Sequence, residues 1–352
     1  MSEDAKPKTS EFDRRNFLKI GGAATAGFLA RGVVAAPAAA LPPLPENQAT
    51  KTAMTTRNLG RTGYRVALFS LGGQAAIEQP DNDAAAVPLV DRALDLGVNY
   101  IDTAAAYGGN QRWSQRYIGQ VMKRRRAQAF LASKTHDRTR DGSLRLLEES
   151  LRLLQTDHLD LWQVHNLSRM EQVEQIFAPG GAIEALQQAR EQKMVRFLGV
   201  TGHADPDVLI QAIRRFPFDT ILLALNAADR HYRSFSERLL PLAVEKQMGI
   251  IGMKVPARGR LLSEWTPPPP SEQQRSWEGG SQPGKITMRE ALFYVLSQPV
   301  STVIIGCDSI GQLEQNVSLA AAYTPLTEEQ RNELAARVEP IARQSLFFRR
   351  WA

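Results

Sequence analysis

Short apolar runs rich in β-favouring residues recur along the chain from residue 64 and alternate with stretches of helical periodicity. The runs end near Gly72, Asp102, Lys134, His165, Thr201, Asn226, Lys254 and Gly306. Apolar residues at three- and four-residue spacing mark the helical stretches 83–96, 144–154, 183–192 and 206–215. Eight strand–helix units predict an α/β fold, a single-domain (β/α)8 TIM barrel. An open doubly wound sheet is the alternative, but residues 71–74 do not form its usual glycine-rich fingerprint.

Several of these runs end in a polar or charged residue. Asp102 ends one, Lys134 the next and His165 a third, and Tyr107 follows Asp102 by five residues. Packing alone does not explain a carboxylate at the end of a core strand, because a buried unpaired charge costs several kcal/mol. The carboxyl ends of barrel strands meet at one face, so we expect these four side chains to form one site.

This set of side chains suits the reduction of a carbonyl group, which needs a hydride on carbon and a proton on oxygen. A tyrosine donates protons poorly at neutral pH, but the ammonium of Lys134 is expected to lower the pKa of Tyr107. Asp102 would keep Lys134 charged, and His165 would orient the substrate oxygen or relay the proton. No side chain supplies a hydride, so a nicotinamide cofactor is expected.

The local sequences Ile-Asp-Thr-Ala-x-x-Tyr, Ala-Ser-Lys and Gln-Val-His around these residues resemble the catalytic tetrad of the aldo-keto reductases, in the same order. The resemblance spans residues 55 to 345 and implies an enzyme that uses NADPH or NADH on a small-molecule carbonyl substrate. A redox-sensing, nicotinamide-binding regulatory protein with little turnover is the alternative from another class. A barrel hydrolase using Asp102 and Asp160 is disfavoured, because Asp160 lies within a strand.

The resemblance also implies a nicotinamide site, from which this sequence departs. After the fifth strand the family usually has Ser-Asn, whose side chains hold the nicotinamide carboxamide, whereas this chain has Thr201 followed by Gly202. The sixth strand offers only Asn226. After the seventh strand Met253 replaces a common stacking tyrosine, and Lys254 is expected near the phosphates.

The segment 303–316 resembles the family's adenosine-binding segment. The residues of this segment that are implied in cofactor binding are Gly306, Ser309, Gln312, Gln315 and Asn316, and Gly72 and Gly259 are further cofactor-binding residues. Asp308 stands where many members place an arginine or lysine for a 2′-phosphate. A carboxylate repels that phosphate and accepts a hydrogen bond from a ribose 2′-hydroxyl, so we expect a weakened preference for NADPH. Capping of the last helix is the alternative role for Asp308.

The substrate is expected to contact Gln74, Trp113 and Asn166, on the loops after the first, second and fourth strands. No pattern there identifies the substrate. The long connection 259–286 contains four consecutive prolines and several glycines. It either folds over the cofactor, as in the resembled family, or forms a surface excursion.

Composition and charge argue against several other classes of function. The chain has 352 residues and a formal charge of +6, without a basic-aromatic stripe, so nucleic-acid binding is not expected. The basic run 123–126 is interpreted as a solvated helix end. The single cysteine, Cys307, excludes an internal disulfide and a cysteine-based metal site, and no metal is expected.

Residues 13–19, Asp-Arg-Arg-Asn-Phe-Leu-Lys, resemble the twin-arginine export signal. The apolar run 20–30 that follows is shorter than the ~20 residues that span a bilayer. We therefore expect a signal peptide over 1–40, the twin-arginine translocase as a partner and a periplasmic or extracytoplasmic protein without a stable membrane span. Residues 41–55 are predicted as a linker, 56–345 as the barrel and 346–352 as a C-terminal tail. The alternative is an amphipathic or disordered N-terminus that contains a chance arginine pair.

Overall fold

The structure is a computed structural model that describes residues 40–267 and 282–350. By its contacts the chain divides into residues Met1–Ala38 and a compact unit Ala39–Ala352. The predicted twin-arginine segment therefore lies outside the described residues, except for residue 40. Residues 268–281 of the long connection and 351–352 of the predicted tail also lie outside them.

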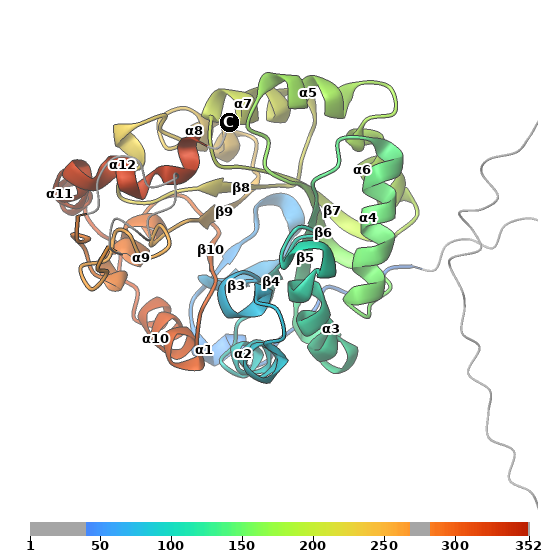
Figure 1. The fold of residues 1–352 in the computed structure, drawn as a ribbon, viewed down its shortest axis with the longest axis horizontal. Coiled ribbons are helices and arrows are strands. Elements are labelled where there is room, and N and C mark those ends of the chain that lie inside the picture. The colour runs from blue at the N-terminus through green and yellow to red at the C-terminus, as the bar shows by residue number, and fades with distance from the viewer. Residues whose placement is uncertain (1–39, 268–281, 351–352) are drawn as a thin grey trace, which may run out of the picture. The chain divides into compact units, whose positions relative to one another are not determined.

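A closed barrel of eight parallel strands forms the centre of the compact unit, in the order β10-β3-β4-β5-β6-β7-β8-β9 (Figure 1). The strands are β3 Phe69–Gly72, β4 Tyr100–Asp102, β5 Phe130–Thr135, β6 Leu159–Val164, β7 Val195–Gly202, β8 Thr220–Ala224, β9 Gly249–Met253 and β10 Thr302–Ile305. The predicted single-domain (β/α)8 barrel is confirmed. Closure removes both sheet edges, so the open doubly wound alternative is wrong.

Helices surround the barrel (Figure 1). They are α1 Thr50–Ala53, α2 Asp83–Asp95, α3 Trp113–Arg125, α4 Arg140–Leu153, α5 Met170–Phe177, α6 Ala182–Glu191, α7 Pro206–Arg215, α8 Leu239–Glu245, α9 Met288–Leu296, α10 Ile310–Ala321, α11 Glu328–Val338 and α12 Ala342–Ser345. Local capping fixes several starts: Asp205 caps α7, and Thr287 with Glu290 forms a capping box at α9. The helix predicted over 206–215 is confirmed.

A hairpin and stacked aromatic side chains close the end of the barrel where the strands begin. The hairpin pairs β1 Thr56–Asn58 with β2 Arg65–Ala67. The Tyr64 ring lies 4.6 Å from Phe130, which stacks at 5.4 Å on Tyr100 and at 6.1 Å on Phe197. Aromatic pairs in this range stabilise a core beyond the area that they bury. The opposite end, where the strands finish, is left for polar side chains.

The stretch predicted as a linker packs against the barrel. Its helix α1 follows Asn47, whose Nδ2 donates to the carbonyl oxygens of Leu94 at 2.7 Å and Val98 at 3.1 Å. Thr50 Oγ1 donates to Gly97 O at 2.8 Å, and both side chains are buried. These bonds satisfy carbonyl groups at the end of α2 and fix this polar segment against that helix end.

The start of the predicted C-terminal tail is part of the core. Residues 346–349 are buried, and Arg349 forms an ion pair with Asp229 in which neither side chain is exposed. Arg349 also donates to Ala224 O at 3.2 Å and lies over the Phe235 ring at 3.8 Å. The prediction of a tail is wrong for these four residues, because a partner 120 residues away leaves no local pattern in the sequence.

The three arginines of the basic run at the end of α3 form ion pairs. Arg124 and Arg125 pair with Asp91, and Arg126 pairs with the buried Asp160 at 2.8 Å. Asp160 also accepts from Leu131 N at 2.9 Å, so it is held near the start of β6 and away from Asp102. This placement removes the hydrolase alternative.

Among the described helices, none is long and apolar enough to cross a membrane.

Candidate active site

The four predicted residues come together where strands β4, β5 and β6 end. Asp102 is the last residue of β4, Lys134 lies near the end of β5, and His165 directly follows β6. Tyr107 lies on the loop after β4. Parallel pairing of Asp102 with Ala132, and of Lys134 with Gln163, brings these positions to one level of the barrel.

Lys134 is the hub of the site. Its Nζ forms an ion pair with Asp102, donates to Thr103 O at 2.8 Å and lies 3.4 Å from the Tyr107 hydroxyl. The side chains of Lys134 and Asp102 are each 1% exposed. The Tyr107 and His165 rings meet edge to face, with centroids 5.7 Å apart. The amine, the phenol and the imidazole therefore converge on one small region.

Burial and mutual attraction act in opposite directions on the ion pair. Burial raises the pKa of Asp102 and lowers the pKa of Lys134, because both charged forms lose water. Their attraction opposes both shifts. Gln163 supports the charged carboxylate by donating from Nε2 to Asp102 at 3.3 Å. Removal of either charge would leave the other without compensation in the barrel interior.

The environment of Tyr107 differs from the expectation. Burial, with the negative charges of Asp102 and Glu78, raises the pKa of Tyr107 well above its usual value of 10, and Arg258 opposes this only in part. A lowered pKa was predicted from Lys134 alone. The carboxylate of Asp102 balances the lysine charge, and desolvation of the phenolate then dominates. Tyr107 is consequently a protonated phenol in the protein without ligands.

His165 is held as a neutral imidazole. Burial lowers its pKa well below 6.5, and the positive charges of Lys134, Arg138 and Lys254 act in the same direction. Its backbone is fixed on both sides: its N–H donates to Thr135 O at 2.8 Å, and its carbonyl accepts from Arg138 Nη2 at 2.8 Å. His165 can therefore donate a hydrogen bond to an oxygen, but it is not an imidazolium that could act as an acid near neutral pH.

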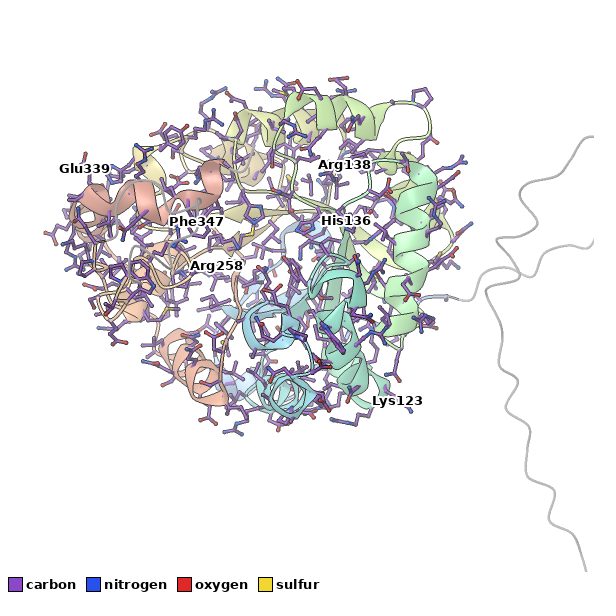
Figure 2. All side chains as sticks on the ribbon, in the orientation of Figure 1. Lys123, His136, Arg138, Arg258, Glu339 and Phe347 are labelled. Atoms are coloured by element: carbon purple, nitrogen blue, oxygen red, sulfur yellow. The ribbon has the colours of Figure 1, made fainter. Side chains whose placement is uncertain are left out.

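Positive charge surrounds this mouth of the barrel. Figure 2 shows Arg138 on the loop after β5, and Arg258 across the barrel on the loop after β9. Lys254 follows β9, and burial together with Arg258 lowers its pKa to about 8. A ligand with phosphate groups fits this mouth of the barrel, because the electrostatic attraction between an anion and a cationic side chain is strongest where the cation is partly desolvated.

The residues predicted to bind the nicotinamide fall into two groups, those at strand ends near the tetrad and Asn226, whose side chain bonds to the backbone. Thr201, Met253 and Lys254 lie at the ends of β7 and β9, at the level of the tetrad. Thr201 Oγ1 accepts from Asn166 N at 2.7 Å. Asn226 is fully buried and turned to the backbone: its Nδ2 donates to Lys254 O at 3.2 Å, and its Oδ1 accepts from Ala228 N at 2.9 Å. Its side chain thus shapes the turn after β8.

The adenosine end is organised by the start of α10. Ser309 caps this helix by accepting from Gln312 N at 3.2 Å, while Gln312 Oε1 accepts from Asp308 N at 2.8 Å. The capping role considered for Asp308 therefore belongs to Ser309. The carboxylate of Asp308 is exposed, as is Gln315, whereas Asn316 is buried and donates to Cys307 Sγ at 3.5 Å.

Glycines allow close backbone approach along the predicted cofactor path. A Cβ on Gly72 would lie 3.0 Å from Gly306 N, and one on Gly306 would lie 3.2 Å from the Gln74 backbone. Gly259 has φ +85°, a conformation that side chains rarely adopt. These glycines, the cationic Lys254 and Arg258, and the exposed polar start of α10 together fit a dinucleotide.

The predicted substrate residues follow the barrel strands: Gln74 comes after β3, Trp113 between β4 and β5, and Asn166 after β6. Gln74 donates to Glu78, and Trp113 begins α3 with its ring stacked on Tyr117 at 5.7 Å. Asn166 follows His165 and has φ +51°. No cluster of histidine, cysteine or carboxylate side chains that could hold a metal occurs in residues 40–267 and 282–350.

Three residues near the tetrad were missed from the sequence. Gln163 could have been found, because it lies two positions before His165 and so shares its face of the strand. No sequence position relative to the tetrad residues points to Arg138 or His203 in the same way. Arg138 reaches the carbonyl groups of His165 and Asn166 from another loop, and His203 reaches the Asn166 side chain from the end of β7.

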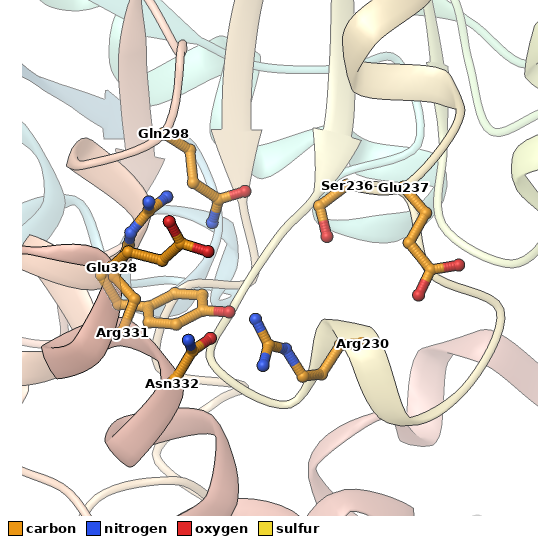
Figure 3. Close-up of a pocket in the computed structure, with 8 residues that line it drawn as sticks. Arg230, Ser236, Glu237, Gln298, Glu328, Arg331 and Asn332 are labelled. Atoms are coloured by element: carbon orange, nitrogen blue, oxygen red, sulfur yellow. The ribbon is translucent and has the colours of Figure 1, made fainter.

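A polar cavity of about 480 Å³ lies elsewhere, between the loop after β8 and helices α9 and α11 (Figure 3). Its lining residues are Arg230, Ser236, Glu237, Tyr294, Gln298, Glu328, Arg331 and Asn332. It shares no residue with the tetrad or with the predicted cofactor path, so it is not the reaction site.

Comparisons with known proteins agree with this geometry. The Aldo/keto reductase family matches residues 68–339. L-galactose dehydrogenase of Arabidopsis thaliana is 28% identical over 314 residues, which cover 82% of this chain and 96% of the relative. An uncharacterized oxidoreductase of Bacillus subtilis is 27% identical over 306 residues, covering 79% and 94%.

Among solved structures, the holo form of an aldo-keto reductase from Bacillus halodurans matches with a TM-score of 0.65 at 27% identity. The match covers 80% of this chain and 96% of that one. Family, relatives and structure all extend over the barrel and its strand-end residues. The chain therefore belongs to the aldo/keto reductase family and is an NAD(P)-dependent oxidoreductase.

Proposed function

We propose that this protein reduces an aldehyde or ketone to an alcohol with NADH or NADPH, or runs the reverse reaction, with Tyr107 as the general acid. The observation that carries the proposal is the position of Lys134 Nζ, paired with Asp102 and 3.4 Å from the Tyr107 hydroxyl. When bound, the nicotinamide dinucleotide supplies the hydride. The sugar named for the Arabidopsis relative makes aldoses the first substrates to assay.

The side chains would then act on the substrate oxygen. Tyr107 gives its phenol proton to the oxygen as negative charge develops there, and the ammonium of Lys134 faces the phenolate that remains. A raised pKa does not prevent this transfer, because an alkoxide is a stronger base than a phenolate. Neutral His165 donates a hydrogen bond to the same oxygen and orients it. Asp102 keeps Lys134 charged in the buried site.

Tyr107→Phe tests the assignment of the acid. We expect kcat for carbonyl reduction to fall by about 10²- to 10⁴-fold, the usual contribution of a positioned acid. Binding of NADH, followed by fluorescence titration, is expected to remain within about twofold, since the phenol acts on the substrate. Tyr323→Phe is the control, because it removes a phenol that bonds to Leu296 O outside the site.

Reduction that survives Tyr107→Phe would show that the acid is misassigned. Nucleotide binding without turnover of any aldehyde or ketone in the unmodified protein would instead favour the nicotinamide-binding regulatory alternative.

The pKa directions predict different pH profiles for the two reaction directions. Reduction needs the phenol, and a pKa raised well above 10 keeps it protonated, so kcat/KM for reduction stays level from about pH 6 to 9. Oxidation of an alcohol needs the phenolate, so its rate rises with pH across the same range. His165 is neutral throughout and adds no inflection near pH 6.5. A fall in reduction centred near pH 7 would contradict these assignments.

The exposed carboxylate of Asp308 supports NADH as the preferred cofactor. We expect NADH to bind at least as tightly as NADPH in titration calorimetry, because Asp308 repels a 2′-phosphate. Asp308→Asn should strengthen NADPH binding about three- to tenfold and leave NADH binding nearly unchanged, since only NADPH carries the added charge. Tenfold tighter binding of NADPH by the unmodified protein would refute the preference.

Export through the twin-arginine translocase to the periplasm is a further part of the proposal, supported by Arg14, Arg15 and the residues after them. Replacing both arginines with lysine should leave the chain in the cytoplasmic fraction, whereas Lys6→Gln should not. Equal periplasmic recovery of both variants would contradict it. A folded protein exported in this way could carry a tightly bound dinucleotide, with two substrates oxidising and reducing it in turn.

A further inference from the structure

One element of the expected nicotinamide site is absent from this chain. The family usually places an amide side chain directly after the serine or threonine that ends the fifth barrel strand, and here that position is Gly202. A Cβ at Gly202 would lie 2.8 Å from Leu167 O and 2.9 Å from Leu209 Cδ1. The backbone there is too close to its neighbours for a side chain, so any amide that serves this position has to come from another part of the chain.

Asn166 lies beside this gap. It directly follows His165, and its backbone N–H donates to Thr201 Oγ1 at 2.7 Å. Its carbonyl oxygen accepts from Arg138 Nη2 at 3.1 Å. The backbone of Asn166 is therefore tied both to the strand that lacks the amide and to the loop after β5. The side chain starts from a fixed point at the level of the tetrad.

The orientation of the Asn166 amide is also fixed. Its Oδ1 accepts from His203 Nδ1 at 2.8 Å and from Ser168 Oγ at 3.2 Å. Burial and nearby positive charges hold the pKa of His203 well below 6.5, so the imidazole is neutral. Because Asn166 Oδ1 can only accept, this hydrogen bond requires the proton on His203 Nδ1. Phe348 packs edge-on against the His203 ring at 6.5 Å. Oδ1 is the Asn166 side-chain atom in both of these hydrogen bonds, and Nδ2 takes part in neither.

We propose that Asn166 replaces the missing amide and donates from Nδ2 to the carboxamide oxygen of bound nicotinamide, with His203 as the positioning residue. The two donors on Oδ1 occupy the acceptor end of the amide and leave its donor end for the ligand. This inference rests on the proposed function, because it concerns the cofactor of the same site. It gives Asn166 a role toward the cofactor, in addition to the substrate contact expected from the sequence.

A purely structural role for Asn166 makes a different prediction. Asparagine tolerates φ +51° better than most residues, and this alone could explain its presence. Glycine adopts the same conformation without strain but has no amide. Asn166→Gly therefore separates the two roles, and Asn166→Asp is its counterpart, because a carboxylate keeps the acceptor for His203 and loses the donor.

The experiment measures the dissociation constants of NADH and ADP-ribose by titration calorimetry, without substrate. ADP-ribose lacks the nicotinamide and serves as the matched control ligand. We expect Asn166→Gly and Asn166→Asp to weaken NADH binding about five- to tenfold, as loss of one neutral hydrogen bond does, and to leave ADP-ribose binding unchanged. His203→Ala should weaken NADH binding by a smaller factor, again without an effect on ADP-ribose.

Unchanged NADH binding by Asn166→Gly would overturn the proposal. An equal loss for NADH and ADP-ribose would also overturn it, because the substitution would then have disturbed the fold of the loop. Neither result depends on turnover. Failure of the proposed function would appear separately, as reduction that persists in Tyr107→Phe.

Discussion

The ion pair between Lys134 and Asp102 is the interaction on which the site depends. Both side chains are almost completely removed from water, at the point where two neighbouring strands of a closed barrel end. Such a pair is stable only when each charge keeps its partner and further hydrogen bonds satisfy the remaining atoms. Gln163 and the carbonyl of Thr103 provide these bonds. The barrel thus holds an ammonium group within reach of the Tyr107 hydroxyl.

The same low-dielectric surroundings set the protonation states of the other two groups. Burial disfavours charge on Tyr107 and on His165 alike, so one remains a phenol and the other a neutral imidazole. The site without ligands therefore contains a proton donor that releases its proton only to a strong base. An oxygen that becomes an alkoxide is such a base, which links the electrostatics of the pocket to carbonyl reduction rather than to hydrolysis.

Contacts between distant segments complete the mouth of the barrel. His203 connects Asn166 to Phe348, and the next residue, Arg349, is buried against Asp229. The end of the chain thereby supports the loops that surround the tetrad. In our proposal Asn166, which these contacts hold in place, supplies the amide, because close packing at Gly202 leaves no room there for a side chain.

The sequence by itself determined the repeating strand–helix pattern and the strand ends that carry the tetrad, because these depend on residues a few positions apart. The tertiary structure decided the direction of the Tyr107 pKa shift, the burial of residues 346–349 and the His203–Asn166 contact. Each depends on groups brought together from separate loops. Desolvation in particular is a property of the closed barrel, and a linear pattern carries no measure of it.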